Sequence, residues 1–93
     1  MLERQVEKAL VSAIKKAGGI APKLTSPGTA GMPDRIVILP GGHICFVELK
    51  APGQQPRPIQ LRQMERLTNL GCMVRTIDHP NQIQELINEI RSA

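Results

Sequence analysis

The sequence predicts one α/β domain in which helices flank a mixed central β-sheet, in the order α-β-β-β-α-β-α. Two observations support this fold class. Residues 35–39 and 44–49 are β-branched, apolar runs separated by the turn sequence PGGH, which indicates a β-hairpin. Apolar residues also recur at helical spacing on both sides of this hairpin, so helices are expected to cover the sheet.

The first element is expected to be a helix over residues 3–17, which the Gly18-Gly19 pair ends. Residues 20–24 predict a short extended strand. Residues 25–33 are expected to form a loop, because they contain two Pro and two Gly in nine positions. The apolar face of the helix comprises Val6, Leu10, Ala13, Ile14 and Ala17.

Both strands of the hairpin are almost continuously apolar, so we expect them to lie centrally and to be covered on two faces. The sequence APGQQPR at residues 51–57 predicts a second loop. Pro58 suits the first turn of a helix that runs to about Leu70, and Gly71 ends it. The residues of this helix expected to face inward are Leu61, Met64, Leu67 and Thr68.

Residues 72–77 predict the last strand. The step from residue 44 to residue 77 is then a β-α-β unit, which is expected to be parallel and right-handed. A final helix follows, with Asp78 or Asn81 as its cap. Its buried stripe consists of Ile83, Leu86, Ile87 and Ile90.

The composition argues against several classes of protein. The 93 residues include one Phe and no Trp or Tyr, which disfavours a base-stacking platform for single strands and an aromatic-anchored protein interface. We expect no membrane association, because no apolar run is long enough to span a bilayer. Cys45 and Cys72 lie in separate apolar runs without a CxxC partner, so free thiols in a reducing cytosol are expected rather than a disulfide.

The charge is unevenly distributed along the chain. Lys and Arg number 12 against eight Asp and Glu, for a net charge of +4. Residues 1–77 hold eleven of the basic residues and only five acidic ones. This imbalance favours a surface that attracts a polyanion such as nucleic acid, although a basic protein without that role has the same composition.

Three charged residues are expected to meet at one end of the hairpin. Asp34 lies where the loop becomes a strand, and Glu48 and Lys50 leave the same face of the next strand because they are two residues apart. Pairing around the glycine turn brings Asp34 opposite the far end of that strand. A salt bridge between Lys50 and either carboxylate explains a lone E-x-K; the additional Pro33-Asp34 favours an ion-binding site.

These residue types suit metal-assisted phosphodiester hydrolysis. Asp34 and Glu48 offer the hard oxygen ligands that Mg²⁺ or Mn²⁺ prefers, with the Leu49 backbone carbonyl as a third. Such a metal polarises a phosphate and lowers the pKa of a bound water. Lys50 can orient that water or neutralise charge on the phosphate. Together the residues form the pattern PD-x13-E-L-K, which is that of the PD-(D/E)xK nuclease superfamily.

Glu7 and Gln60 each have two interpretations. Glu7 borders the apolar face of the first helix and can bind metal directly or through water, or can be a surface glutamate that is unpaired or paired with Arg4 or Lys8. Gln60 lies in the first turn of the second helix and can touch a phosphate or the attacking water, or can be a solvated polar residue.

The chain resembles the VRR-NUC family of this superfamily. The resemblance rests on V6-E7-x2-L10, G31-M32-P33-D34-R35, V47-E48-L49-K50, and Q60 in a helix that ends at L70-G71. It implies a restriction-endonuclease-like fold, with residues 1–93 as a single, stand-alone nuclease domain. It also implies a Mg²⁺- or Mn²⁺-dependent endodeoxyribonuclease whose catalytic set matches Glu7, Asp34, Glu48, Lys50 and Gln60.

Small stand-alone members of this family look like homodimers that act on branched DNA, with four-way junctions as the leading substrate, in the cytoplasm of a bacterium or a phage-infected host. No small-molecule cofactor is expected. With so few aromatic residues, DNA should be recognised by backbone and shape. The expected DNA contacts are Lys15, Lys16, Lys23, Arg35, Arg57, Arg62 and Arg66.

Two other functions compete with this one. A non-catalytic nucleic-acid-binding domain could retain the nuclease fold, but it has no reason to keep Asp34, Glu48 and Lys50 at a strand end. A protein-interaction domain that uses the Pro-Gly loops predicts weak, salt-insensitive contact with DNA.

Overall fold

The structure, a computed structural model, describes residues 1–93 and contains three helices and one three-stranded mixed sheet. The predicted fold class is therefore confirmed, and most element boundaries agree with the sequence analysis to within two residues. The elements are α1 (Glu3–Lys16), β1 (Arg35–Leu39), β2 (His43–Leu49), α2 (Pro58–Asn69), β3 (Val74–Ile77), the 3₁₀ turn η1 (Pro80–Gln82) and α3 (Ile83–Ser92). None of the three helices has the length and hydrophobicity that a membrane span requires.

The sheet has the order β1-β2-β3, so β2 is its central strand. β1 and β2 pair antiparallel as the predicted hairpin, with Arg35 opposite Val47. β2 and β3 pair in parallel, with Glu48 opposite Thr76, as expected for a β-α-β unit. This register fixes which residues of the neighbouring strands share a face with Glu48 at the C-terminal end of β2.

Residues 20–24 form two isolated bridges to β1 rather than the regular strand that the sequence predicts. The bridges occur at Ile20 and Lys23. Pro22 explains the gap between them: its carbonyl accepts the Ile36 N–H at 3.1 Å, but proline has no N–H to return the bond. The segment nevertheless covers the outer edge of β1.

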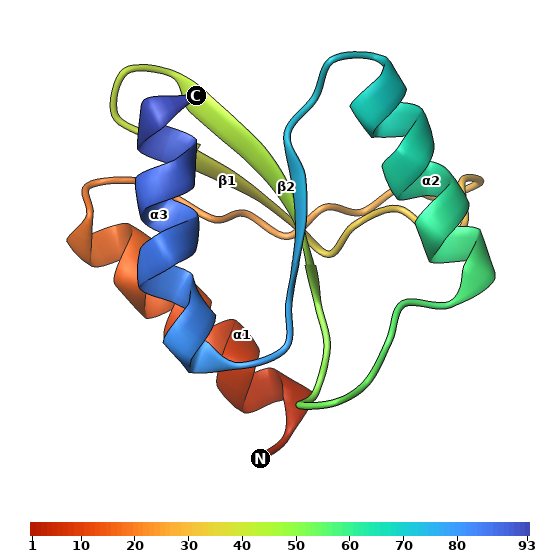
Figure 1. The fold of residues 1–93 in the computed structure, drawn as a ribbon, viewed down its shortest axis with the longest axis horizontal. Coiled ribbons are helices and arrows are strands. Elements are labelled where there is room, and N and C mark those ends of the chain that lie inside the picture. Colours follow the sequence, from red (N-terminus) through yellow and green to blue (C-terminus); the bar gives the residue numbers. More distant parts are fainter.

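The helices lie on both faces of the sheet. Figure 1 shows α1 and α3 on one side and α2 on the other. The hydrophobic core fills the space between the sheet and the α1–α3 pair, because alternate strand residues point that way. Its members include Leu10, Ile14, Val37, Leu39, Val47, Leu49, Leu86 and Ile90.

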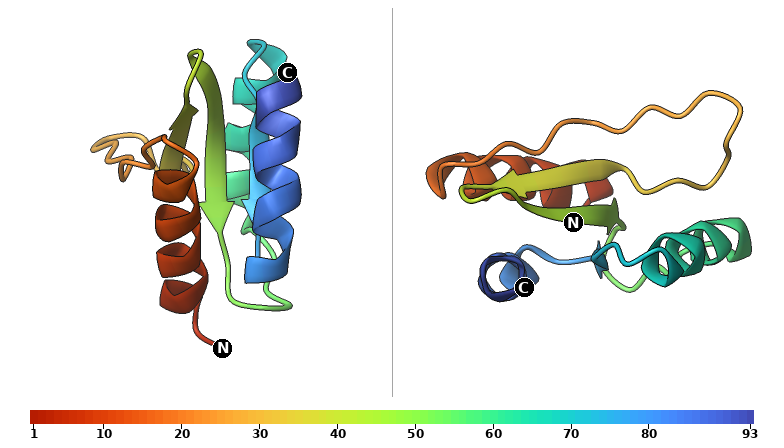
Figure 2. Two further views of the ribbon diagram at one scale, coloured as in Figure 1. Left: turned by 90° about the vertical axis from the view of Figure 1, so that its left-hand side faces the viewer. Right: turned by 90° about the horizontal axis from the view of Figure 1, so that it is seen from above.

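The α2 side of the sheet is packed differently. Gln60 is the only buried residue of α2, whereas the predicted inward residues Leu61 and Thr68 are exposed. The prediction was wrong at these two positions because the helix turns Gln60 toward the sheet, and Leu61 is then rotated away from it by one 100° step. Figure 2 shows that the segment between α1 and β1 extends past the sheet beside α2.

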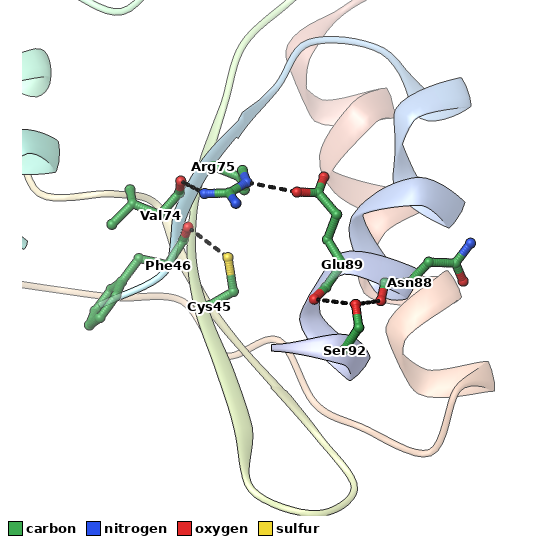
Figure 3. Close-up of polar contacts among 7 residues, drawn as sticks. All are labelled: Cys45, Phe46, Val74, Arg75, Asn88, Glu89 and Ser92. Carbon is green, nitrogen blue, oxygen red and sulfur yellow. Dashed lines mark hydrogen bonds and ion pairs between the residues drawn. The ribbon is translucent and has the colours of Figure 1, made fainter. Parts of the chain in front are cut away.

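Arg75 links the outer strand β3 to α3, as Figure 3 shows. Its Nε lies 3.2 Å from Glu89 Oε2, and its Nη1 donates to the carbonyl oxygen of Val74 at 2.8 Å. The carbonyls of Met73 and Ile77 accept N–H groups from the β2 side, at Phe46 and Lys50, so the Val74 carbonyl points to the open edge. Arg75 therefore occupies an acceptor on that edge.

Candidate active site

The hairpin places two carboxylates side by side at one end of the sheet. Asp34 precedes Arg35, which pairs with Val47, so Asp34 lies opposite Glu48. Asp34 Oδ2 accepts the backbone N–H of Leu49 at 2.8 Å. This bond holds the carboxylate against the β2 main chain just where β1 has ended, as the hairpin pattern predicts.

Glu48 is the most unusual residue of this site, because its side chain is only 1% exposed. Its Oε2 accepts a hydrogen bond from Gln60 Nε2 at 2.6 Å and forms an ion pair with Lys50 Nζ at 2.9 Å. Its Oε1 is buried and has no hydrogen-bond partner in the protein. A buried carboxylate oxygen without a donor is costly, so a ligand is expected to complete it.

The electrostatics of Glu48 point the same way. Burial raises the pKa of Glu48, and the neighbouring Asp34 carboxylate raises it further, while the Lys50 ammonium acts in the opposite direction. The Lys50 ammonium pairs with Glu48 and forms no ion pair with the neighbouring Asp34. A bound divalent cation would offset both the burial and the repulsion.

Gln60 is oriented by the helix that carries it. Its Oε1 accepts the backbone N–H of Arg57 at 2.8 Å and so closes the first turn of α2. The amide nitrogen then points at Glu48. Of the two interpretations of Gln60, the solvated surface residue is wrong, since only 8% of it is exposed.

The salt bridge that competed with the ion-binding hypothesis is present, between Lys50 and Glu48. It does not complete the site, because the Lys50 ammonium binds Oε2 and leaves Oε1 without a partner. Lys50 itself is largely covered, with 14% of its side chain exposed. The charges at this strand end therefore include one, on Glu48, that the ion pair alone does not satisfy.

Glu7 is placed apart from the other two carboxylates. Its Oε2 lies 3.1 Å from Arg35 Nη2, and Arg35 Nη1 donates to the carbonyl oxygen of Ala21 at 2.9 Å. The chain contains no group of three His, Cys, Asp or Glu side chains that could hold a metal. The structure thus pairs Glu7 with Arg35 rather than with Arg4 or Lys8, and its role as a metal ligand stays a prediction.

The predicted DNA-binding residues do not share one face. Lys15 and Lys16 are exposed in the last turn of α1, whereas Arg62 and Arg66 are exposed on α2 across the sheet (Figure 1). Arg35 is 17% exposed at its side chain and is held by Glu7 and Ala21, so it is not a free surface cation. The residues on the same side of the sheet as Glu48 and Gln60 are Arg57, Arg62 and Arg66.

Asp78 has a role that the sequence does not predict. Rather than capping the last helix, Asp78 accepts the Gly53 N–H at 3.2 Å and the Gln82 Nε2 at 2.8 Å, which ties the loop after β2 to the start of η1. His79 Nδ1 accepts the Asn81 N–H at that turn. The Pro-Gly composition of residues 51–57 predicted a loop but not its anchor.

The donor set fits a hard divalent cation. Asp34 and Glu48 contribute carboxylate oxygens, one of them buried without a partner, and the Leu49 carbonyl belongs to the residue that Asp34 holds. The site contains no Cys or His, so a soft or imidazole-preferring metal is disfavoured.

Comparison with known proteins agrees with this fold. No family model matches the chain. A protein named "Putative nuclease p44", from Acyrthosiphon pisum secondary endosymbiont phage 1, is 55% identical over 76 residues, which are 82% of each protein. A solved structure described as "VRR_NUC domain" superimposes with a TM-score of 0.86 at 38% identity, over 92% of this chain and 94% of that one. A second, "VRR_NUC domain protein", has a TM-score of 0.77 at 17% identity over 99% and 89%, which shows the shared fold.

Proposed function

Because this chain belongs to the VRR-NUC family of nucleases, we propose that it is a Mg²⁺- or Mn²⁺-dependent DNA endonuclease whose metal site is formed by Asp34 and Glu48. The observation that carries the proposal is Glu48 Oε1, a buried carboxylate oxygen that has no donor and lies beside a second carboxylate. A purely structural ion pair between Glu48 and Lys50 leaves that oxygen unexplained.

The residues that would hold the metal are Asp34, Glu48 and the Leu49 backbone carbonyl. When bound, the metal supplies a Lewis acid that polarises the scissile phosphate and lowers the pKa of a water. The Leu49 N–H fixes Asp34, and Gln60 with Lys50 fixes Glu48, so both carboxylates are preorganised before any ligand arrives.

Lys50 has the second role in the proposed mechanism. Its ammonium lies beside Glu48 Oε2. There it can neutralise charge that develops on the phosphate, or orient the attacking water. Gln60 holds the Glu48 carboxylate in one orientation through its N–H. Glu7 is proposed to contribute indirectly, from the α1 side, through a water.

The proposed substrate is branched DNA, with four-way junctions first, bound by two copies of the chain. Arg57 precedes the helix that carries Gln60, and Arg62 and Arg66 are exposed on its outer face, so we propose that these three residues contact phosphates of the DNA that reaches the site. Lys15, Lys16 and Lys23 lie elsewhere on the surface and are proposed to hold a second DNA arm. A two-fold dimer of single nuclease domains brings two such sites to one junction.

The test incubates the protein with labelled four-way junction, flap and linear duplex in Mg²⁺, Mn²⁺, Ca²⁺ or EDTA. We expect cutting in Mg²⁺ or Mn²⁺, none in EDTA, and faster cutting of the junction than of the duplex. Glu48→Ala should abolish cutting, and Glu85→Ala, exposed on α3 across the sheet, is the matched control.

Three outcomes would contradict parts of the proposal. Cutting in EDTA, or undiminished cutting by Glu48→Ala, would overturn the metal-carboxylate mechanism. Equal cutting of duplex and junction would remove the structure specificity and leave the nuclease. Tight DNA binding without cutting in any metal would favour the non-catalytic binding domain.

A further inference from the structure

Gly31 brings the loop before β1 into direct contact with the first turn of α2. Its φ is +86°, and a Cβ at this position would lie 2.8 Å from the carbonyl oxygen of Ile59 and 3.0 Å from Ile59 Cγ1. A real Cβ essentially never comes that close to a backbone atom. The main chain of the loop therefore packs on the main chain of the helix, which only glycine permits here.

Both sides of this contact continue into the candidate active site. On the helix side, the next residue is Gln60, whose amide donates to Glu48. On the loop side, three residues lead through buried Pro33 to Asp34, which accepts the Leu49 N–H. The contact therefore lies between the two chain segments that deliver Asp34 and Gln60.

α2 has few other means of fixing its position. Gln60 is its only buried residue, and its remaining apolar residues are half-buried or exposed. The distance of closest approach between the loop and Ile59 thus decides how near the first turn of α2 comes to the sheet. A side chain at residue 31 would move that turn outward and draw the Gln60 amide away from Glu48.

We infer that Gly31 is a positioning residue, whose missing side chain lets α2 approach closely enough for Gln60 to hold Glu48 in the orientation that binds the metal. The inference rests on the proposed function for its effect on catalysis. The contact and its effect on Gln60 can be measured without metal or DNA.

Gly28 provides a matched control in the same loop. Its φ is +84°, so an alanine there meets the same unfavourable backbone conformation as at Gly31. A Cβ at Gly28 meets no atom within 4 Å. Any difference between Gly31→Ala and Gly28→Ala is therefore due to the contact with Ile59.

The first measurement uses the metal-free protein. The side-chain amide signals of Gln60 are identified in ¹H–¹⁵N spectra by their loss in Gln60→Ala, and their exchange with water is compared with that of exposed Gln55. In the wild type and in Gly28→Ala, exchange should be slow, because the amide donates to a buried carboxylate. In Gly31→Ala it should be at least about tenfold faster.

A second variant keeps the test decisive if Gly31→Ala does not fold. Ile59→Ala removes the Cγ1 side of the contact without adding any atom, and Ile59 is outside the buried core. It should give an intermediate increase in Gln60 exchange, whereas Leu61→Ala, at an exposed position of the same turn, should give none. Unchanged Gln60 exchange in both Gly31→Ala and Ile59→Ala would overturn the inference.

The catalytic consequence is tested by a double-mutant cycle. Gly31→Ala should lower kcat for junction cutting by about tenfold or more with little change in KM, and Gly28→Ala should not. In a Gln60→Ala background, Gly31→Ala should cause no further loss, because the two act through one contact. If no variant or wild type cuts DNA but Gln60 exchange still responds to Gly31→Ala alone, the nuclease proposal fails and the structural inference stands. If the wild type cuts and both glycine variants behave alike, the inference fails and the nuclease stands.

Discussion

Gln60 donates its amide N–H to the buried carboxylate of Glu48 at 2.6 Å while its own oxygen accepts the Arg57 N–H at the start of α2. The Gln60 side chain therefore both caps the helix and belongs to the site. The orientation of the amide is fixed from the helix side, so the carboxylate always meets a donor and never an acceptor. Replacing that donor should affect stability as well as the site.

Gln60→Glu should destabilise the metal-free protein more than Gln60→Ala at pH 8. Both variants remove a hydrogen bond to a charged group, which costs roughly 1.5–3 kcal/mol. The glutamate also places a second negative charge against a carboxylate that is only 1% exposed, which adds about 1 kcal/mol or more. Urea unfolding in EDTA measures the difference, and equal free energies of unfolding for the two variants would contradict the geometry.

Mn²⁺ should raise the melting temperature of the wild type but not that of Glu48→Gln. A ligand that binds only the folded state stabilises it by about 2.7 kcal/mol at one hundred times its Kd. Glu65→Gln removes the same charge from the exposed surface of α2 and should keep the Mn²⁺ effect. An equal shift in Glu48→Gln and the wild type would place the metal elsewhere.

Glu7 and Arg35 should show a coupling energy of about 0.5–1 kcal/mol in a double-mutant cycle with Glu7→Gln and Arg35→Met. The pair is 3.1 Å apart, and its side chains are 28% and 17% exposed, so water screens it only in part. Urea unfolding measures the four free energies; a coupling near zero would contradict the pairing. Titration of Glu7→Gln with Mn²⁺ tests the predicted metal role, which requires weaker binding.

Cys45 should resist alkylation at pH 8 while Cys72 reacts. Burial raises the pKa of Cys45 from its ordinary value of 9.0 to about 12, and its side chain is inaccessible. Since the folded state keeps this thiol protonated, stability due to Cys45 is complete below pH 9 and falls as the pH rises toward 12. Iodoacetamide labelling followed by mass spectrometry measures the rate at each cysteine. Equal rates at Cys45 and Cys72 would contradict the prediction.

Arg62→Ala and Arg66→Ala should each weaken DNA binding in EDTA. Each should also reduce the slope of the logarithm of the binding constant against the logarithm of the salt concentration by about 1. Both arginines are exposed on the helix that carries Gln60. Arg91→Ala, on α3 across the sheet, is the control of equal charge change. DNA affinities are measured for the three variants over a range of salt concentrations. An equal loss of affinity in all three variants would contradict a specific contact from α2.

The hairpin and its consequences could be predicted because they depend on local rules. The PGGH turn sets the pairing register, and the register alone brings Asp34 opposite Glu48. Glu48 and Lys50 share a face because strand residues alternate. The resemblance to the nuclease family then assigned Asp34, Glu48 and Lys50 to a metal-dependent site from the sequence alone.

The remaining features depend on contacts between distant segments. Amphipathicity predicted that Leu61 faces inward. The helix instead turns Gln60 toward the sheet, because Gln60 donates to the buried carboxylate of Glu48. The Glu7–Arg35 pair joins residues 28 positions apart, which no local pattern reveals. Gly31 is part of the quoted motif, yet its need for glycine appears only when Ile59 is placed beside it.

Arg75 has a consequence for how two copies can assemble. Its guanidinium occupies the Val74 carbonyl at the open edge of β3 and is itself held by Glu89. A second chain that extended the sheet by adding a strand there would first have to displace both contacts. The proposed homodimer should therefore form through helix and loop surfaces, and each sheet should end at its own third strand.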